Sequence, residues 1–142
     1  MSALNSLVRV HNWALDEKRQ KLAELDRLAD KLRSDLALLE QELVQEQSAA
    51  SRSVEGSIAF PAFIAAALER RKRLRDSIAN IELACEAARN EVNLAFQDMK
   101  KFELARDNQV AQENSEMARR EQTALDDLGV DLHRRSAPDD PS

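Results

Sequence analysis

The side chains best suited to acid–base, nucleophilic or metal chemistry in this sequence are His11, His133 and the one cysteine, Cys85. Neither histidine stands at metal-ligand spacing from a carboxylate or from the other histidine. Carboxylates are plentiful, but they alternate with Lys and Arg as on a solvated helix face, whereas a catalytic pair needs a desolvated cleft. No phosphate-binding glycine loop, paired cysteines or nucleophile motif occurs. We therefore expect a protein that acts by binding, with no enzymatic activity, cofactor or metal.

Two other features could take part in chemistry or binding, but each has a simpler structural interpretation. A lone cysteine such as Cys85 is more often a small core residue than a redox switch, and it cannot form an internal disulfide, which fits a reducing compartment. The basic cluster "LERRKRLR", residues 68–75, is interpreted first as a solvated helix face and second as a site for an acidic protein partner. Nucleic acid ranks third, because the cluster lacks aromatics and the formal net charge is -5. The role of Arg70 to Arg75 stays open.

The composition predicts a few long helices rather than an ordinary globule. The 142 residues include only two glycines and three prolines, so turns are few. With 33% charged residues and 43% hydrophobic residues, the chain is typical of a coiled coil and too apolar for a disordered protein. It has no apolar run of about 18 residues that would span a membrane. Its N-terminal stretch has no apolar signal core, so we expect a cytoplasmic location.

A seven-residue period of apolar positions runs through both halves of the sequence. It predicts the seam of a left-handed coiled coil. The polar exceptions are His11, Lys18 and Arg71, which we expect to set register or to extend toward solvent. The first-half seam positions are Val8, Leu15, Leu22, Ala29, Leu36 and Leu43, alternating with Leu4, His11, Lys18, Leu25, Leu32 and Leu39; the second-half positions are Ile64, Arg71, Ile78, Cys85, Val92 and Met99, alternating with Phe60, Ala67, Leu74, Ile81, Ala88, Ala95 and Phe102.

A connection is predicted between the two halves at "SAASRSVEGS", residues 48–57, which is small and polar. We expect Ser57 to cap the second helix and Pro61 to lie in its first turn. A short connection makes the helices antiparallel neighbours. The sequence thus predicts an all-α fold, a long two-helix antiparallel coiled-coil hairpin with an overhanging C-terminal helix segment. The expected parts are a hairpin domain at 3–130, with helix 1 at about 3–48, a loop at about 49–57 and helix 2 at about 58–128.

The C-terminal part of the second helix is expected to lack a partner within the chain. After Phe102 the seam positions turn polar, although no helix breaker follows at once. Residues 103–128 should therefore extend past the hairpin as a helix that is marginal unless a partner holds it. Gly129 is suited to the left-handed position that ends a helix. The polar, Pro-containing tail at 131–142 is expected to be disordered.

The single tryptophan occupies an unexpected position in the charged stretch "RVHNWALDEKRQ". In the heptad frame Trp13 points directly away from the seam, and Val10 lies one turn before it on nearly the same face. One interpretation is that a bend or the overhanging segment covers both residues, since scattered exposed apolar residues are normal. The other is an anchor for a partner protein, because tryptophan is enriched at binding hot spots. Both interpretations stay open.

Three stretches resemble the FliJ family of bacterial flagellar type III export proteins. The N-terminal "LNSLVRVHNWALDEKRQKLAEL" resembles the family's start, and "FIAAALERRKRLRDSIANIE" resembles the start of its second helix. The C-terminal "MKKFELARD" and "ARREQTALDDLGV" are similar to the family's Lys-Lys-x-Glu and Arg-x-Glu-Gln-x-x-Leu-Asp-Glu signatures, with Asp126 and Asp127 as the final acidic pair. Together the stretches span residues 4 to 130 in the family's order.

This resemblance implies a cytoplasmic coiled coil similar to the gamma stalk of rotary ATPases, peripheral at the cytoplasmic face of the inner membrane. It implies binding to the ring of the export ATPase FliI, whose assembly it would promote. It further implies binding to the linker of the export gate FlhA and to export chaperones, with no nucleic acid. The residues implied at the ATPase end are Val10, Trp13, Arg119, Arg120 and Glu121, and those at the export-gate end are Val44, Gln47, Phe63 and Ala67.

Three other functions fit the same pattern. A substrate chaperone of another type III secretion system would bind an amphipathic export substrate without affecting any ATPase. A nucleic-acid-binding helical hairpin would show steeply salt-dependent RNA affinity centred on residues 70–75. Self-association into a dimer or four-helix bundle would bury outward apolar residues such as Leu28 and Trp13.

Overall fold

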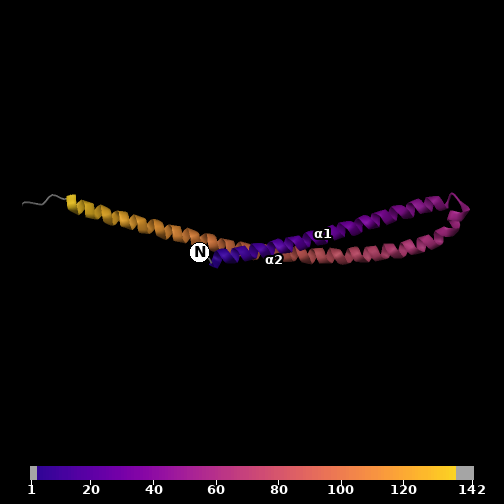
Figure 1. Ribbon diagram of the computed structural model, residues 1–142, viewed down its shortest axis with the longest axis horizontal. Coiled ribbons are helices and arrows are strands. Elements are labelled where there is room, and N and C mark those ends of the chain that lie inside the picture. Colours follow the sequence, from indigo (N-terminus) through magenta and orange to yellow (C-terminus); the bar gives the residue numbers. More distant parts are fainter. Residues whose placement is uncertain (1–2, 137–142) are drawn as a thin grey trace, which may run out of the picture. The chain divides into compact units, whose positions relative to one another are not determined.

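The computed structural model describes residues 3–136 and consists of two helices, α1 (Ala3–Ala50) and α2 (Val54–Ser136). No strand occurs within this described range, so the predicted all-α class is confirmed. Figure 1 shows α1 and α2 running antiparallel from a tight connection. The molecule forms two compact units, Met1–Val10 with Met99–Ser142 and His11–Asp98, and each is described separately below.

In the His11–Asp98 unit, the two helices pack against each other along the predicted seams. Every seam position of this unit is buried or half-buried. Leu15 and Ala29 are among the most deeply buried side chains. This burial pattern, at intervals of three and four residues on both helices, is consistent with a coiled-coil hairpin. Toward the connection, the core is a cluster of Leu39, Leu43 and Ala67, against which Phe63, Ile64 and Leu74 pack.

Four ion pairs join the two helices within the described residues, and three of them, which we call the ladder, follow one flank of this seam. The fourth joins Lys18 Nζ and Glu91 Oε2 at 3.3 Å. The acidic and basic partners of the ladder alternate at seven-residue spacing on each helix, so the signs alternate along the flank. A slip of one helix by seven residues would place Asp26 opposite Glu82, and charges beside a coiled-coil seam set the register in this way. The three pairs are Arg89 Nη2–Asp26 Oδ1 at 3.5 Å, Arg33 Nη2–Glu82 Oε1 at 3.1 Å and Arg75 Nη2–Glu40 Oε1 at 3.4 Å.

Reversing one charge of this ladder should weaken the hairpin, and reversing both should restore it. Exposed ion pairs contribute about 0.2–1 kcal/mol, so Glu40→Arg should lower the free energy of unfolding by about 1 kcal/mol once repulsion from Arg75 is included. The double variant Glu40→Arg with Arg75→Glu should recover most of this loss. Urea titration followed by circular dichroism measures both. A double variant no more stable than the single one would show that the two side chains do not interact.

The connection is shorter than predicted, because both helices extend into the expected loop. Helix α1 continues to Ala50, and α2 begins at Val54 rather than near residue 58. The cap is Ser53 and not Ser57, since the backbone N–H of Gly56 donates to Ser53 Oγ at 2.9 Å. A Cβ at Gly56 would lie 2.8 Å from that Oγ, so glycine suits the position. The small residues that suggested a loop include Ala49 and Ala50, and alanine is the best helix former.

The other unit, Met1–Val10 with Met99–Ser142, contains the start of α1 and the C-terminal part of α2. Within it Val8 and Met99 are buried. Leu4 and Asn5 line a shallow hollow of about 170 Å³ together with Arg106 and other residues of α2. Every residue at 107–136 is exposed, whereas Glu103 and Arg106, which the prediction included in the segment without a partner, are half-buried.

The predicted end of the second helix at Gly129 is wrong. The helix continues through this glycine to Ser136, and no glycine of the described chain has a positive φ. A glycine inside a helix costs about 1 kcal/mol relative to alanine, which a long helix tolerates. Basic side chains in the last turn also complement the helix dipole. Residues 131–136 are thus helical, whereas the rest of the predicted disordered tail, 137–142, lies outside the described residues.

Candidate partner-binding surfaces

Trp13 lies on the outer face of α1, in the His11–Asp98 unit. Its side chain is 63% exposed, whereas Leu15, two residues later, is buried in the seam. The structure thus agrees with the outward position that the heptad frame predicted. A large indole that contacts solvent over most of its area is a candidate anchor, since a partner would remove much apolar surface from water by covering it.

The other residues predicted at the ATPase end belong to the unit that contains the C-terminal part of α2. Val10 is exposed in α1. Arg119, Arg120 and Glu121 are also exposed, and Thr123 Oγ1 donates to the carbonyl of Arg119 at 3.0 Å. The predicted set is therefore divided between the two compact units, with Trp13 in the other one.

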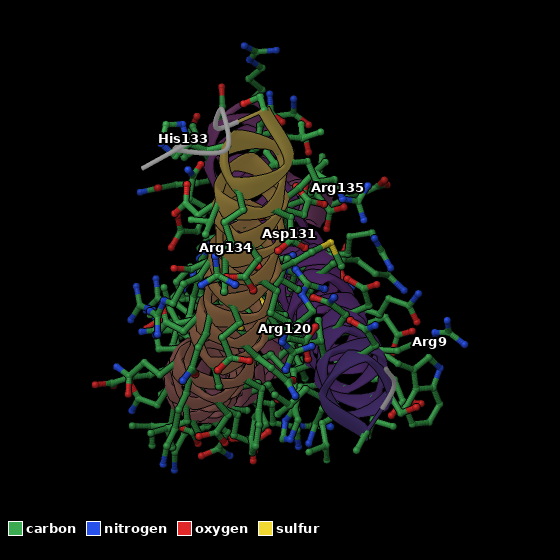
Figure 2. All side chains as sticks on the ribbon, turned by 90° about the vertical axis from the view of Figure 1, so that its left-hand side faces the viewer. Arg9, Arg120, Asp131, His133, Arg134 and Arg135 are labelled. Carbon is green, nitrogen blue, oxygen red and sulfur yellow. The ribbon has the colours of Figure 1, made fainter. Side chains whose placement is uncertain are left out.

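The last turn of α2 adds positive charge that the site prediction did not include. His133, Arg134 and Arg135 occupy this turn, and Figure 2 shows their side chains projecting from the helix. Ser136 Oγ donates to the carbonyl of His133 at 3.1 Å, which satisfies one of the carbonyl groups left without a helical partner. Cations at a helix C-terminus are stabilised by the dipole. The guanidinium groups of Arg134 and Arg135 are therefore placed where they complement the negative end of the helix dipole.

The four residues predicted at the export-gate end differ in how much they are exposed. Val44 is 67% exposed, and Gln47 is exposed as well. Phe63 is half-buried against the core cluster, and its ring stacks on Phe60 with centroids 6.5 Å apart. Ala67 is only 5% exposed and belongs to the cluster itself. Because its methyl group faces the other helix, Ala67 has a packing role and offers almost no surface to a partner.

The basic cluster on α2 is engaged in part by neighbouring carboxylates. Arg73 Nε lies 3.6 Å from Glu69 Oε1, and Arg75 pairs with Glu40 of α1. Arg71 is half-buried at its seam position. These contacts favour the interpretation of the cluster as a solvated face of the hairpin.

Cys85 is buried in the seam between two ion pairs of the ladder. Burial raises the pKa of its thiol, and a hydrogen bond to Asp26 raises it further. Because the thiolate is the reactive form, this environment disfavours nucleophilic or redox chemistry near neutral pH. Within residues 3–136, no group of three or more His, Cys, Asp or Glu side chains is arranged to hold a metal ion. The described helices also contain no segment long and apolar enough to cross a membrane.

The two most exposed of the large apolar side chains in the described residues were not included in the sequence-based site prediction. Val54 and Ile58, in the first turns of α2, are 77% and 75% exposed. Val54 lies in the stretch predicted to be a loop, and Ile58 lies directly after it. Exposed side chains are expected in a loop, so neither residue was considered for a binding site. The sequence feature that could have revealed them is the apolar run at residues 58–68, which is longer than one buried helix face requires.

Comparison with known families identifies the class of protein to which these surfaces belong. The chain matches the family described as flagellar FliJ protein over residues 1–138. The chain belongs to the FliJ family. It is therefore related to flagellar protein export, and the family match extends the resemblance found in three separate stretches to residues 1–138 of this chain. Neither the comparison with curated proteins nor that with solved structures gives a match.

Proposed function

We propose that this FliJ-family chain is a non-enzymatic adaptor of flagellar export, which binds the ring of the ATPase FliI and promotes its assembly. Family membership supports the export role. The observation that carries the adaptor role is the exposed helical segment at 107–136 of α2. A helix without a packed face gains little stability of its own, so a partner that covers it would contribute much of its order.

The apolar side chains of this segment support the same proposal. Met117, Leu125, Leu128 and Leu132 are all exposed, and their spacing of three, four or eight residues places them on one side of the helix. Glu121 lies within this stripe and Arg120 flanks it, whereas Arg119 lies on the opposite side of the helix. We assign the ATPase contact to this segment together with Val10 and Trp13. In this proposal the segment at 107–136 overhangs the hairpin and has no packing partner until the ATPase binds.

We assign the contact with the linker of the export gate FlhA to the half of the hairpin near the connection. Val44 and Gln47 support this assignment because both side chains are exposed on α1. Phe63 contributes one edge, and Ala67 acts by packing. Binding of export chaperones and a peripheral position at the cytoplasmic face of the inner membrane complete the proposed role.

Secretion of flagellar subunits tests this function directly. A strain that lacks the chain should release far less hook and filament protein into the medium, and the wild-type gene should restore release. Loss of a different type III substrate, with flagellar secretion intact, would instead favour the chaperone of another secretion system. Unchanged secretion of all substrates would contradict an export role.

A further inference from the structure

An apolar groove lies on the flank of the hairpin opposite the ladder, within the His11–Asp98 unit, and we call this side the open flank. The ladder residues directly follow seam positions, whereas Leu28 directly precedes the seam position Ala29 and so lies on the other flank. Leu28 is 45% exposed. None of the residues that line this open groove of about 400 Å³ is charged, so a partner would remove apolar surface from water by covering it. The lining residues are Leu28, Leu32, Ser77, Asn80 and Ile81.

Charges of opposite sign lie on α1 at equal distances on either side of this groove. Lys21 lies seven residues before Leu28 and Asp35 seven residues after it, so all three occupy one row of the heptad. Neither Lys21 nor Asp35 forms an ion pair among the described residues. A two-fold rotation about an axis through Leu28 would place Lys21 beside Asp35 of a second copy, and Asp35 beside its Lys21. It would also bring Glu24 close to Lys31 of the copy.

Charges on α2 have the same symmetry about the same groove. Arg70 and Glu91 are equally far along the helix from the point between Asn80 and Ile81, and both lie in one row of the heptad. Because Asn80 and Ile81 line the groove together with the symmetry point of α1, the two symmetry points lie at the same level of the hairpin. One two-fold axis would therefore also bring Arg70 to Glu91 of the copy. Glu91 contacts Lys18 of its own chain at 3.3 Å, whereas Arg70 has no ion pair within residues 3–136.

The remaining side chains of the open flank are compatible with this arrangement. Leu94 is 61% exposed, and it would lie over Ala66 of the copy. Arg73, which is paired with Glu69 of its own helix, would face Ala87. No like charges would stand directly opposite each other. Toward the ends of the contact, acidic residues would face apolar ones, namely Glu17 with Leu38, Glu42 with Ala14 and Asp98 with Phe63.

We propose that the open flank is a homodimer interface, in which two hairpins pack as an antiparallel four-helix bundle about a two-fold axis through the groove. A two-fold interface brings the same patch of both subunits together, so opposite charges at equal distances from the axis attract each other. A membrane or an unrelated partner requires no such symmetry, and here it occurs on both helices. The proposal does not rest on the export role.

The size of the open flank agrees with a dimer of moderate affinity. The stretch from Arg70 to Glu91 is about 32 Å long, and two helices of about 10 Å each make the flank about 20 Å wide. The dimer then buries roughly 1,300 Å² in total, which is at the lower end of the range for specific interfaces. We expect a dissociation constant of about 10 μM.

Charge reversals in the full chain test the proposal by sedimentation equilibrium at about 1–100 μM. Lys21→Glu should weaken the dimer about tenfold or more, because it places carboxylates beside both copies of Asp35, and Asp35→Lys should do the same with two ammonium groups. An equimolar mixture of the two variants should dimerise again, because each then meets the opposite charge. The matched control, Arg27→Glu on the outer face of α1, should change the affinity by less than about twofold. Circular dichroism at the helix band checks that every variant is folded.

Several results would overturn this assignment. A wild-type chain that is monomeric at about 100 μM would exclude the dimer. A mixture that associates no better than the separate variants would exclude the pairing of Lys21 with Asp35, and an equal loss in the Arg27 variant would show that the open flank is not the contact. If the wild type is monomeric and Leu28→Ser weakens binding to the ATPase FliI, the flank belongs to that partner. If the same substitution abolishes co-sedimentation with phosphatidylglycerol vesicles, it belongs to a membrane.

Discussion

Replacing Leu39 by alanine is expected to lower the free energy of unfolding of the hairpin by about 2–5 kcal/mol. Leu39 is 3% exposed and forms the core cluster with Leu43 and Ala67. The substitution removes buried methyl groups and leaves a cavity that a rigid pair of helices fills only in part. Thermal or urea unfolding followed by circular dichroism at the helix band measures the loss.

The adjacent Leu38 provides the matched control. It is 56% exposed, belongs to the same helix and undergoes the same change of residue type, so the effect of helix propensity cancels. Leu38→Ala should change the free energy of unfolding by no more than about 0.5 kcal/mol. Equal destabilisation by the two substitutions would contradict the assignment of Leu39 to the seam.

Replacing Trp13 by alanine should weaken the proposed complex with the export ATPase by about 2 kcal/mol or more, roughly thirtyfold in the dissociation constant. The expectation follows from the exposed indole, which has much apolar area to lose to a partner. Sedimentation velocity or calorimetric titration of the two purified proteins measures the change. The free chain should keep its stability, because the side chain contributes little to the core.

Asn12→Ala, one residue away on the exposed surface of α1, is the control for this substitution. It should leave the affinity within about twofold of the wild type. If the Trp13 variant binds the ATPase with unchanged affinity, other residues form the contact. Trp13 would then be one of the scattered exposed apolar residues that ordinary protein surfaces carry.

The burial pattern of the helices was predictable because it depends on local periodicity. Leu15, Ala29 and Leu39 belong to a series of apolar residues at intervals of three and four. Residues at these intervals lie on one side of a helix, and this side is buried against the other helix. The ladder of ion pairs depends on which residues of the two helices face each other. That relation needs the register, which the loop length leaves uncertain by several residues. Arg33 and Glu82 were therefore not paired from the sequence, although the structure places their side chains 3.1 Å apart.

The helix ends were less predictable because competing signals act at each of them. Ser53 and Ser57 both suit a helix cap, and only the backbone geometry decides in favour of Ser53. Gly129 suits a helix end but is tolerated inside a long helix, and the charges beyond it favour continuation. The family resemblance implied that Ala67 contacts the export gate, without regard to the direction of its side chain. The heptad frame had already placed this residue in the seam, where it faces the other helix.

The hydrolysis rate of the cognate export ATPase, titrated with this FliJ-family chain, tests the proposed adaptor role most directly. We expect the wild-type chain to raise the rate to a plateau, because a bound adaptor favours the assembled ring. Trp13→Ala should reach the same plateau only at a much higher concentration. A hydrolysis rate that neither protein changes at any concentration would contradict the proposal that the chain binds and promotes the ATPase.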